Sequence, residues 1–231
     1  QTEEVLFGQE GLVENLKPGT VVISCATVAP NFAIDMERRC KEFEIFYLDA
    51  PISGGALKAK NGQLSIMASG VKEAFQHARP TLDSISETVF ELGDEAGTGS
   101  AMKSVNQLLA GVHIAVMAEA LTFGISQGIS PDKFVEVISK CAGTSWMLEN
   151  RAPHIVNGDY KPHSSIHIWP KDLGIVLDVA LESKFNAPIA TAALEQFRTA
   201  VDMGLGFEDD AAVAKVYAKS ANLSLPKKND V

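Results

Sequence analysis

The stretch GTGSAMKSVNQLLAGVHIAVMAEALTFGISQG, residues Gly97 to Gly128, divides the sequence into two parts with different patterns. After its first glycines it contains no proline, and its apolar residues occupy most sides of the helix that it would form. Helices that are hydrophobic on all sides are normally buried. We therefore expect one long buried helix over residues 100–128, which leads from one domain into the next.

The residues before this stretch alternate between β-rich runs and helical spacing. Strands are expected in TVVISCA, IFYLDAP, LSIMASG and TVFELG, and the helix before the last strand is expected to be interrupted at Pro80. Strands that are separated by helical segments predict βαβ units and a sheet that is at least partly parallel. The sequence thus predicts an α/β domain over residues 1–96.

The residues after the boundary show helical periodicity and no convincing strand pattern. Further helices are expected over residues 131–141, 145–155, 170–183, 188–202 and 209–219. Most of these segments begin at Pro, Ser or Asp, which are typical of helix starts. The sequence therefore predicts an all-α domain over residues 97–225, joined to the α/β domain through the long helix.

Composition and charge argue against several classes of protein. Hydrophobic residues make up 46% and charged residues 21% of the 231 residues, as in ordinary globular proteins. A net charge of −9 argues against binding to nucleic acid or to an anionic membrane surface. No apolar run is expected to approach the roughly 18 residues that span a membrane. The 3 cysteines are far apart, which predicts buried thiols in a reducing compartment, the cytoplasm or alternatively the mitochondrion.

Lys103 lies on the face that the long helix is expected to bury, with Asn106 and Gln107 about one turn further on. A buried lysine is costly unless it deprotonates or finds a partner. Desolvation lowers the pKa of a lysine toward neutrality, which suits a role in proton transfer. The alternative is a side chain that extends to water at the start of the helix, and the residue taken alone favours this alternative.

Ser53, Gly54 and Gly55 follow the strand in IFYLDAP and lie in a predicted loop. Successive glycines let backbone N–H groups converge on an anion, and the serine hydroxyl adds a donor or an acceptor. The C-terminal ends of strands are also where α/β sheets bind ligands. From this stretch alone, a site for a small anion and an ordinary glycine-rich turn are equally supported.

Three further patterns carry less weight. GTGSAM fits only the start of a GxGxxG fingerprint, because Met102 occupies the final glycine position. Lys171 opens a helix, where a cation opposes the macrodipole, so it either binds a ligand or points to solvent, and the charge alone favours solvent. His154, His163 and His167 have no carboxylate or cysteine at the spacing of a metal site. We expect ordinary hydrogen-bonded or surface histidines and no metal.

In combination these motifs resemble the β-hydroxyacid dehydrogenases, the family of 3-hydroxyisobutyrate and tartronate semialdehyde reductases. The family's substrate loop, PxSGGxxxAxxG, is matched from Pro51 to Gly62, and its catalytic segment, GxGxxxKxxN, from Gly97 to Asn106. Its late Lys-Asp pair is matched by Lys171-Asp172. The resemblance extends over essentially the whole chain. The segments LLAGVHIAVMAEAL, SWMLENRAPHIVNGDY and PKDLGIVLD are similar to the L-threonate dehydrogenase branch.

The resemblance implies a function and roles for single residues. Residues 1–96 would be the C-terminal part of a Rossmann-like domain, and the activity would be NAD-dependent oxidation of a small 2-hydroxy or 3-hydroxy acid, L-threonate above all. Lys103 would be the general acid/base. Gln107 stands where most members of the family have a second Asn. The substrate would contact Ser53, Gly54, Gly55, Asn106 and Gln107, and the cofactor would contact Thr27 and Lys171.

The first strand and the GxGxxG loop of the family have no counterpart in this sequence, since Gln1-Thr2 matches a point inside the nucleotide domain. The residues that separate NAD from NADP would lie in that part of the pattern, so NADP is the alternative cofactor. The alternative function is a non-catalytic, oligomer-forming homologue that cannot bind dinucleotide. In both cases the resemblance implies a homodimer or homotetramer formed through the helical domain.

Overall fold

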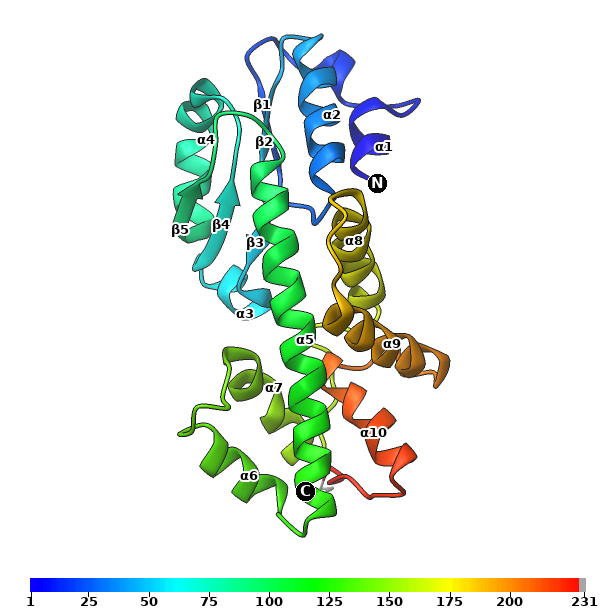
Figure 1. Ribbon diagram of the computed structural model, residues 1–231. Helices are drawn as coiled ribbons and strands as arrows, with labels where there is room; N and C mark the ends of the chain where they lie inside the picture. Colours follow the sequence, from blue (N-terminus) through cyan, green and yellow to red (C-terminus); the bar gives the residue numbers. More distant parts are fainter. Residues whose placement is uncertain (229–231) are drawn as a thin grey trace. The chain divides into compact units, whose positions relative to one another are not determined.

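The computed structural model describes residues 1–228, and the chain divides into two compact units, of which the first ends at Asn106 and the second begins at Gln107. One continuous helix, α5 (Thr98–Ser126), belongs in part to each unit and is drawn in green in Figure 1. The first unit is α/β, and the second is built of helices. These features confirm the predicted fold class, a Rossmann-like part and a helical part joined through a long helix.

Two small sheets form the framework of the first unit. β1 (Val21–Ser24) pairs in parallel with β2 (Phe46–Asp49), and β4 (Leu64–Ala68) pairs in parallel with β5 (Ser86–Glu91). β3 (Ile52–Ser53) is antiparallel to β4, and a bridge between Asp49 and Ser69 connects the two sheets. Parallel pairing was predicted. The strand β3 was not, because 2 residues leave no alternation to detect.

Two helices, α2 (Pro30–Lys41) and α4 (Lys72–Ile85), pack against these strands. Figure 1 shows α4 beside β4 and β5. The prediction for α4 was wrong in one respect, since the helix continues through Pro80. Pro80 faces solvent, whereas Ala78 and Leu82 on the other side of the helix are buried. Burial of that face outweighs the single backbone hydrogen bond that proline removes.

Three short elements complete the first unit and were not predicted as separate elements. They are the helix α1 (Thr2–Phe7), the 3-10 turn Val13–Asn15 and the helix α3 (Gly55–Lys60). Each has at most 6 residues, which is too short for a helical period to stand out in the sequence.

The strand β2 divides the core of the first unit. Tyr47 packs with Met36 and Cys40 under α2, whereas the next residue, Leu48, packs with Leu82 under α4. Successive side chains of a strand point to opposite faces, so β2 is buried on both faces. A strand that is buried on both faces has a continuous apolar sequence, which explains why IFYLDAP was recognisable as a strand.

Helices α6 to α10 pack with the C-terminal part of α5 in the second unit. They are α6 (Pro131–Ile138), α7 (Trp146–Val156), α8 (Ile168–Glu182), α9 (Pro188–Asp202) and α10 (Ala214–Ser220), with a 3-10 turn at Asp210–Val213. The hydroxyls of Ser130 and Ser145 cap α6 and α7 by accepting hydrogen bonds from backbone N–H groups of the first turn. The predicted helices are present, except that the segment 209–219 is divided into a 3-10 turn and α10.

The core of the second unit is organised around α5. Ile114, Met117 and Leu121 follow one another at helical spacing and are fully buried in one cluster with Trp169 and Phe197. The rings of Trp169 and Phe197 are stacked, with their centroids 5.4 Å apart. The apolar sequence of α5 is therefore explained by burial in this core.

Two adjacent carboxylates, Asp209 and Asp210, are fully buried in the second unit. Asp210 accepts hydrogen bonds from Arg151 Nε (2.5 Å) and Trp169 Nε1 (3.0 Å), and Asp209 lies 2.8 Å from His154 Nδ1. Burial raises the pKa of Asp210. Burial also acts to raise the pKa of Asp209, but its hydrogen bonds, first that with His154, hold this pKa below its ordinary value. The pairings satisfy charges that would be costly if buried alone.

The expectation that no apolar run approaches the length of a membrane span was wrong for α5. An 18-residue window within α5 has a mean hydropathy of 1.8, so the helix is long and apolar enough to cross a membrane by length and composition. Half of that window is buried inside the structure. The core helix of a folded domain shows the same properties, so length and composition are weak evidence for a membrane span.

The expectation of buried thiols is confirmed for Cys40 and is wrong for Cys141, which is exposed just after α6. Cys25 is partly buried, and all 3 cysteines are free. Burial raises the pKa of Cys40 to about 11 and also raises the pKa of Cys25. Burial thus makes these two thiols weakly reactive.

Two glycine-to-alanine variants test the packing around α5. A Cβ at Gly111 would lie 2.9 Å from Trp169 Cε3 and 3.0 Å from Leu173 Cδ2, whereas a Cβ at Gly174, in α8, has no neighbour within 4 Å. We expect Gly111→Ala to lower the free energy of unfolding by about 1–3 kcal/mol. Gly174→Ala should raise it by about 0.5–1 kcal/mol, because alanine favours a helix. Chemical denaturation measures both, and equal shifts would contradict this packing.

Candidate active site

The Ser53–Gly55 segment joins β3 to α3 rather than forming the loop that was expected. Ser53 ends β3, and Gly54 and Gly55 have φ angles of +133° and +69°, which side-chain-bearing residues rarely adopt. A Cβ at Gly54 would lie 2.8 Å from Lys58 Cβ, whereas a Cβ at Gly55 would meet nothing within 4 Å. The segment thus combines a hydroxyl, backbone that only glycine adopts easily, and open space.

Lys103 lies in α5 and is buried, with 7% of its surface exposed. Its Nζ donates a hydrogen bond of 2.8 Å to the backbone carbonyl of Ile52. Ile52 directly precedes Ser53, so the hydrogen bond holds the amine beside the Ser53–Gly55 segment. The structure therefore rejects the solvent-exposed alternative that Lys103 favoured when it was considered alone.

Asn106 and Gln107 follow Lys103 by about one turn of α5, so the three residues lie toward one side of the helix. In the second unit, Gln107 is buried and its Nε2 donates a hydrogen bond of 2.6 Å to Asp172 Oδ2 in α8. Lys171 has a side chain that is 60% exposed, and its Nζ lies 3.0 Å from Asp172 Oδ1. Asp172 thus connects Gln107 to the Lys-Asp pair of the sequence.

Thr27 lies in the segment between β1 and α2 and is partly buried. This segment follows the carboxyl end of a parallel strand, which is the edge where α/β sheets bind nucleotides. The first turn of α2, which follows it, contains no acidic side chain that would repel an anionic ligand. Thr27 thus presents its hydroxyl close to this edge of the sheet.

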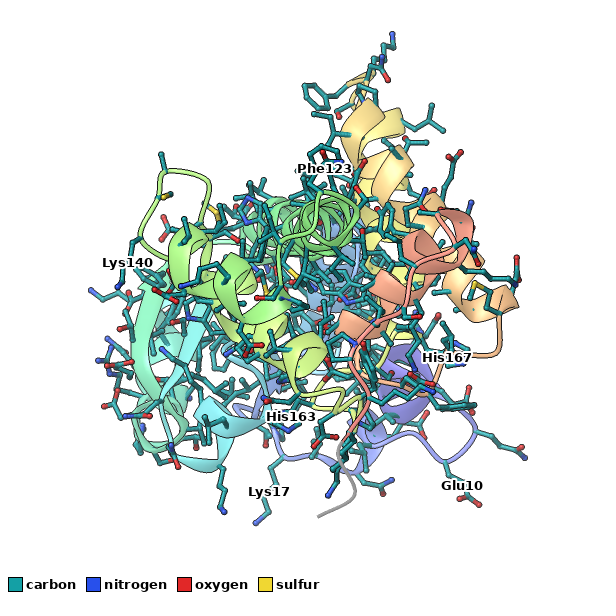
Figure 2. All side chains as sticks on the ribbon, turned by 90° about the horizontal axis from the view of Figure 1, so that it is seen from below. Glu10, Lys17, Phe123, Lys140, His163 and His167 are labelled. Carbon is teal, nitrogen blue, oxygen red and sulfur yellow. The ribbon has the colours of Figure 1, made fainter. Side chains whose placement is uncertain are left out.

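The three histidines take part in two separate ring contacts of the second unit. The rings of His154 and His163 are 5.1 Å apart, whereas the ring of His167 packs against Phe207 at 4.7 Å. Figure 2 labels His163 and His167. Within residues 1–228, no three His, Cys, Asp or Glu side chains are grouped so that they could hold a metal ion.

Comparison with known proteins identifies the family of the chain. Residues 1–93 match the family model described as the NAD binding domain of 6-phosphogluconate dehydrogenase. Residues 97–217 match the model described as NAD-binding of NADP-dependent 3-hydroxyisobutyrate dehydrogenase, which is more than half of the chain. The chain belongs to the 3-hydroxyisobutyrate dehydrogenase-like family. It is thus an NAD(P)-dependent oxidoreductase of the hydroxyacid dehydrogenase type.

Relatives in this family are similar over nearly the whole chain. The L-threonate dehydrogenase of Cupriavidus necator is 49% identical over 94% of this chain and 73% of its own length. The crystal structure of a 3-hydroxyisobutyrate dehydrogenase from Salmonella typhimurium is 42% identical, with a TM-score of 0.89 over 94% of this chain and 75% of that chain. The structure of Psf3 in complex with NADP+ and 2-OPP is 25% identical, with a TM-score of 0.86 over 94% and 76%.

Sequence reasoning missed the contacts of two carboxylates, one in each unit. Asp172 was recognised only as part of a motif. Its contact with Gln107 depends on packing between α5 and α8, since the two residues are 65 positions apart in the sequence. Asp49 was recognised only as the end of a strand, although it contacts the start of α5. The only sign of these contacts in the sequence was an Asp at the end of an apolar strand, and this pattern does not indicate which residues the Asp contacts.

The pair of Gln107 and Asp172 makes the site testable without a substrate. Gln107→Leu removes an amide donor from a carboxylate whose side chain is only 4% exposed. We expect the free energy of unfolding, measured by urea denaturation, to fall by about 1–3 kcal/mol because a buried acceptor is left unpaired. The double variant Gln107→Leu/Asp172→Leu should recover most of this loss, and a double variant as unstable as the single one would contradict the pairing.

Proposed function

We propose that this protein oxidises a small hydroxy acid with NAD, that L-threonate is its substrate, and that Lys103 transfers the proton. The observation that carries the proposal is the hydrogen bond of Lys103 Nζ to the Ile52 carbonyl, which places an amine beside the Ser53–Gly55 segment. The choice of L-threonate is supported by relatives named L-threonate dehydrogenase, 49% identical in Cupriavidus necator and 45% identical in Escherichia coli.

The proton-transfer step uses an amine that is removed from water. The neutral amine of Lys103 accepts the proton of the substrate hydroxyl at Nζ, while one of its N–H groups stays on the Ile52 carbonyl. That hydrogen bond fixes the position of the nitrogen, and a positioned general base accelerates a reaction by about 10²–10⁴-fold. In the reverse direction, the protonated amine returns the proton to the carbonyl oxygen of the keto acid.

The carboxylate of the substrate is assigned to the Ser53–Gly55 segment. The Ser53 hydroxyl and the backbone N–H groups of Gly54 and Gly55 supply donors, and the space beside Gly55 leaves room for a ligand. Asn106 and Gln107 are assigned to the polar groups of the substrate further along α5. Gln107 is held in one orientation by Asp172, which favours a defined amide contact over a mobile one.

The dinucleotide is assigned to Thr27 and Lys171. A nicotinamide held there would supply the acceptor for the hydride of the hydroxyl-bearing carbon. Thr27 presents a hydroxyl after the carboxyl end of β1, and Lys171 presents an exposed ammonium that suits a phosphate. We propose NAD rather than NADP, and a comparison of the catalytic efficiency with the two dinucleotides tests this choice.

Replacing Lys103 tests the assigned chemistry. Lys103→Ala should lower the rate of L-threonate oxidation by about 10²–10⁴-fold, because the proton acceptor is lost. Lys133→Ala is the matched control, since Lys133 lies on the exposed surface of α6, paired with Glu136. The absorbance of the reduced nicotinamide measures both rates. A Lys103→Ala protein with a near-normal rate would refute the assignment, and a folded wild-type protein that binds no dinucleotide would favour the non-catalytic alternative.

We further propose that a second copy of the chain covers one face of α5 to form a homodimer. Met102, Leu109, Val116 and Phe123 are spaced by seven residues and are 45 to 65% exposed. Apolar residues at this spacing form the stripe through which helices pack against one another.

A small hydroxy acid, rather than a nucleic acid or a membrane, remains the proposed ligand.

The exposed stripe predicts how the dimer can be broken. Leu109→Glu/Val116→Glu places two charges on the stripe and should shift the protein to a smaller species in light scattering coupled to size exclusion. Val137→Glu is the control, because Val137 is 46% exposed on α6 and lies outside the stripe. A wild-type protein that stays monomeric at high micromolar concentration, or equal effects of the two substitutions, would contradict the proposal.

A further inference from the structure

The start of α5 is capped by a side chain from another element of the first unit. Oδ2 of Asp49, the last residue of β2, accepts hydrogen bonds from the backbone N–H groups of Gly97 (3.0 Å) and Ser100 (2.8 Å). Its Oδ1 accepts a hydrogen bond of 2.7 Å from the Ser100 hydroxyl. The N–H groups of a first helical turn have no partner within the helix, so Asp49 supplies acceptors that α5 itself lacks.

Asp49 is itself held rigidly. Its backbone N–H and carbonyl exchange hydrogen bonds with the carbonyl and N–H of Ser69, at 3.0 and 2.8 Å. The Ser69 hydroxyl accepts a hydrogen bond of 2.9 Å from the Gly99 N–H and donates one of 3.4 Å to Asp49 Oδ2. Asp49, Ser69 and Ser100 are all fully buried. The side chain of Asp49 is therefore a fixed hydrogen-bond acceptor at the N-terminal end of the helix.

The backbone of α5 also approaches the strands too closely for a side chain. A Cβ at Gly99 would lie 2.5 Å from the carbonyl oxygen of Met67 and 2.7 Å from that of Asp49. Glycine is thus required at position 99 because a side chain would collide with these carbonyl oxygens, and no nucleotide phosphate is needed to explain it. The first turn of α5 lies directly against the ends of β2 and β4, which leaves it little freedom to shift.

The same strand segment contacts α5 a second time, at Lys103. Lys103 follows Ser100 by nearly one turn of the helix, and its Nζ donates to the carbonyl of Ile52, three residues after Asp49. Asp49 therefore fixes the backbone of α5, and Ile52 fixes the end of the lysine side chain. Both contacts come from the four residues that lead into Ser53.

We propose that Asp49 is a positioning residue for Lys103, which sets the place of the Lys103 amine by binding the first turn of α5. The inference rests on the proposed function, since it concerns the residue to which proton transfer is assigned. Without the carboxylate, the N–H groups of Gly97 and Ser100 would be buried with no acceptor, and the turn that carries Lys103 would shift or open. Misplacement of a reacting group by about 1 Å can lower a rate by about 10²-fold.

Asp49→Asn tests the proposal because it keeps the shape of the side chain, but both oxygens of Asp49 accept hydrogen bonds and the amide retains only one acceptor oxygen. Glu37→Gln is the matched control. Glu37 Oε2 accepts a hydrogen bond of 3.1 Å from the Ala96 N–H, just before the helix, and an amide oxygen can keep this contact. We expect Asp49→Asn to lower kcat for L-threonate by about 10- to 100-fold with a smaller change in KM. Glu37→Gln should stay within about twofold of the wild-type kcat.

Two measurements do not depend on turnover. Hydrogen exchange should become faster at the amides of Gly97 and Ser100 in Asp49→Asn. Acetylation of Lys103 by acetic anhydride, followed by mass spectrometry relative to the exposed Lys133, should become several-fold faster. Ser100→Ala removes only the 2.7 Å contact with Oδ1 and should give a smaller shift in the same direction, which keeps the proposal testable if Asp49→Asn does not fold.

The outcomes separate this inference from the proposed function. Wild-type kcat, exchange and acetylation in Asp49→Asn would overturn it, and so would equal losses of kcat and of melting temperature in Asp49→Asn and Glu37→Gln. If Lys103→Ala is as active as the wild type, the proposed function fails. Lys103 acetylation then decides the inference alone: a faster reaction in Asp49→Asn supports the positioning role, and an unchanged one overturns it.

Discussion

The N–H groups that begin a helix need acceptors, and in the first unit this requirement is met by the carboxylate of Asp49. The consequences extend along α5. Because Asp49 ends β2, the helix starts against the edge of the sheet, where position 99 has no space for a side chain. Because Ile52 follows Asp49 closely, the carbonyl that receives Lys103 Nζ comes from the same segment as the helix cap. Burial of a lysine is tolerated there because its partner is already in place.

The second unit follows the same physical rule with different residues. Asp172 receives the amide of Gln107, and Asp210 receives the guanidinium of Arg151 and the indole of Trp169. In each case a buried carboxylate joins elements that are distant in sequence by accepting a hydrogen bond from a side-chain donor. Apolar packing around α5 provides the bulk of that core, and these polar pairs define which helices meet.

The fold was predictable where a pattern is long enough to be periodic or is buried on both sides. The strand in IFYLDAP and the helix α5 are such cases, and both were found near their expected bounds. The failures have local causes. β3 and α3 are too short for a period, Pro80 lies on the solvent side of α4 where a missing N–H is tolerated, and Cys141 lies just past the end of α6.

The sequence by itself determined the α/β class, the long helix and the three motifs around Ser53, Lys103 and Lys171, because propensity, periodicity and motif spacing are properties of neighbouring residues. It left the environment of Lys103 open, and on the residue alone it favoured solvent. Only the tertiary structure decided that the amine is buried on the Ile52 carbonyl, that Asp49 caps α5 and that Asp172 holds Gln107. The physical reason is that burial and hydrogen-bond partners depend on residues about 50 to 65 positions away, which come together only when the chain packs.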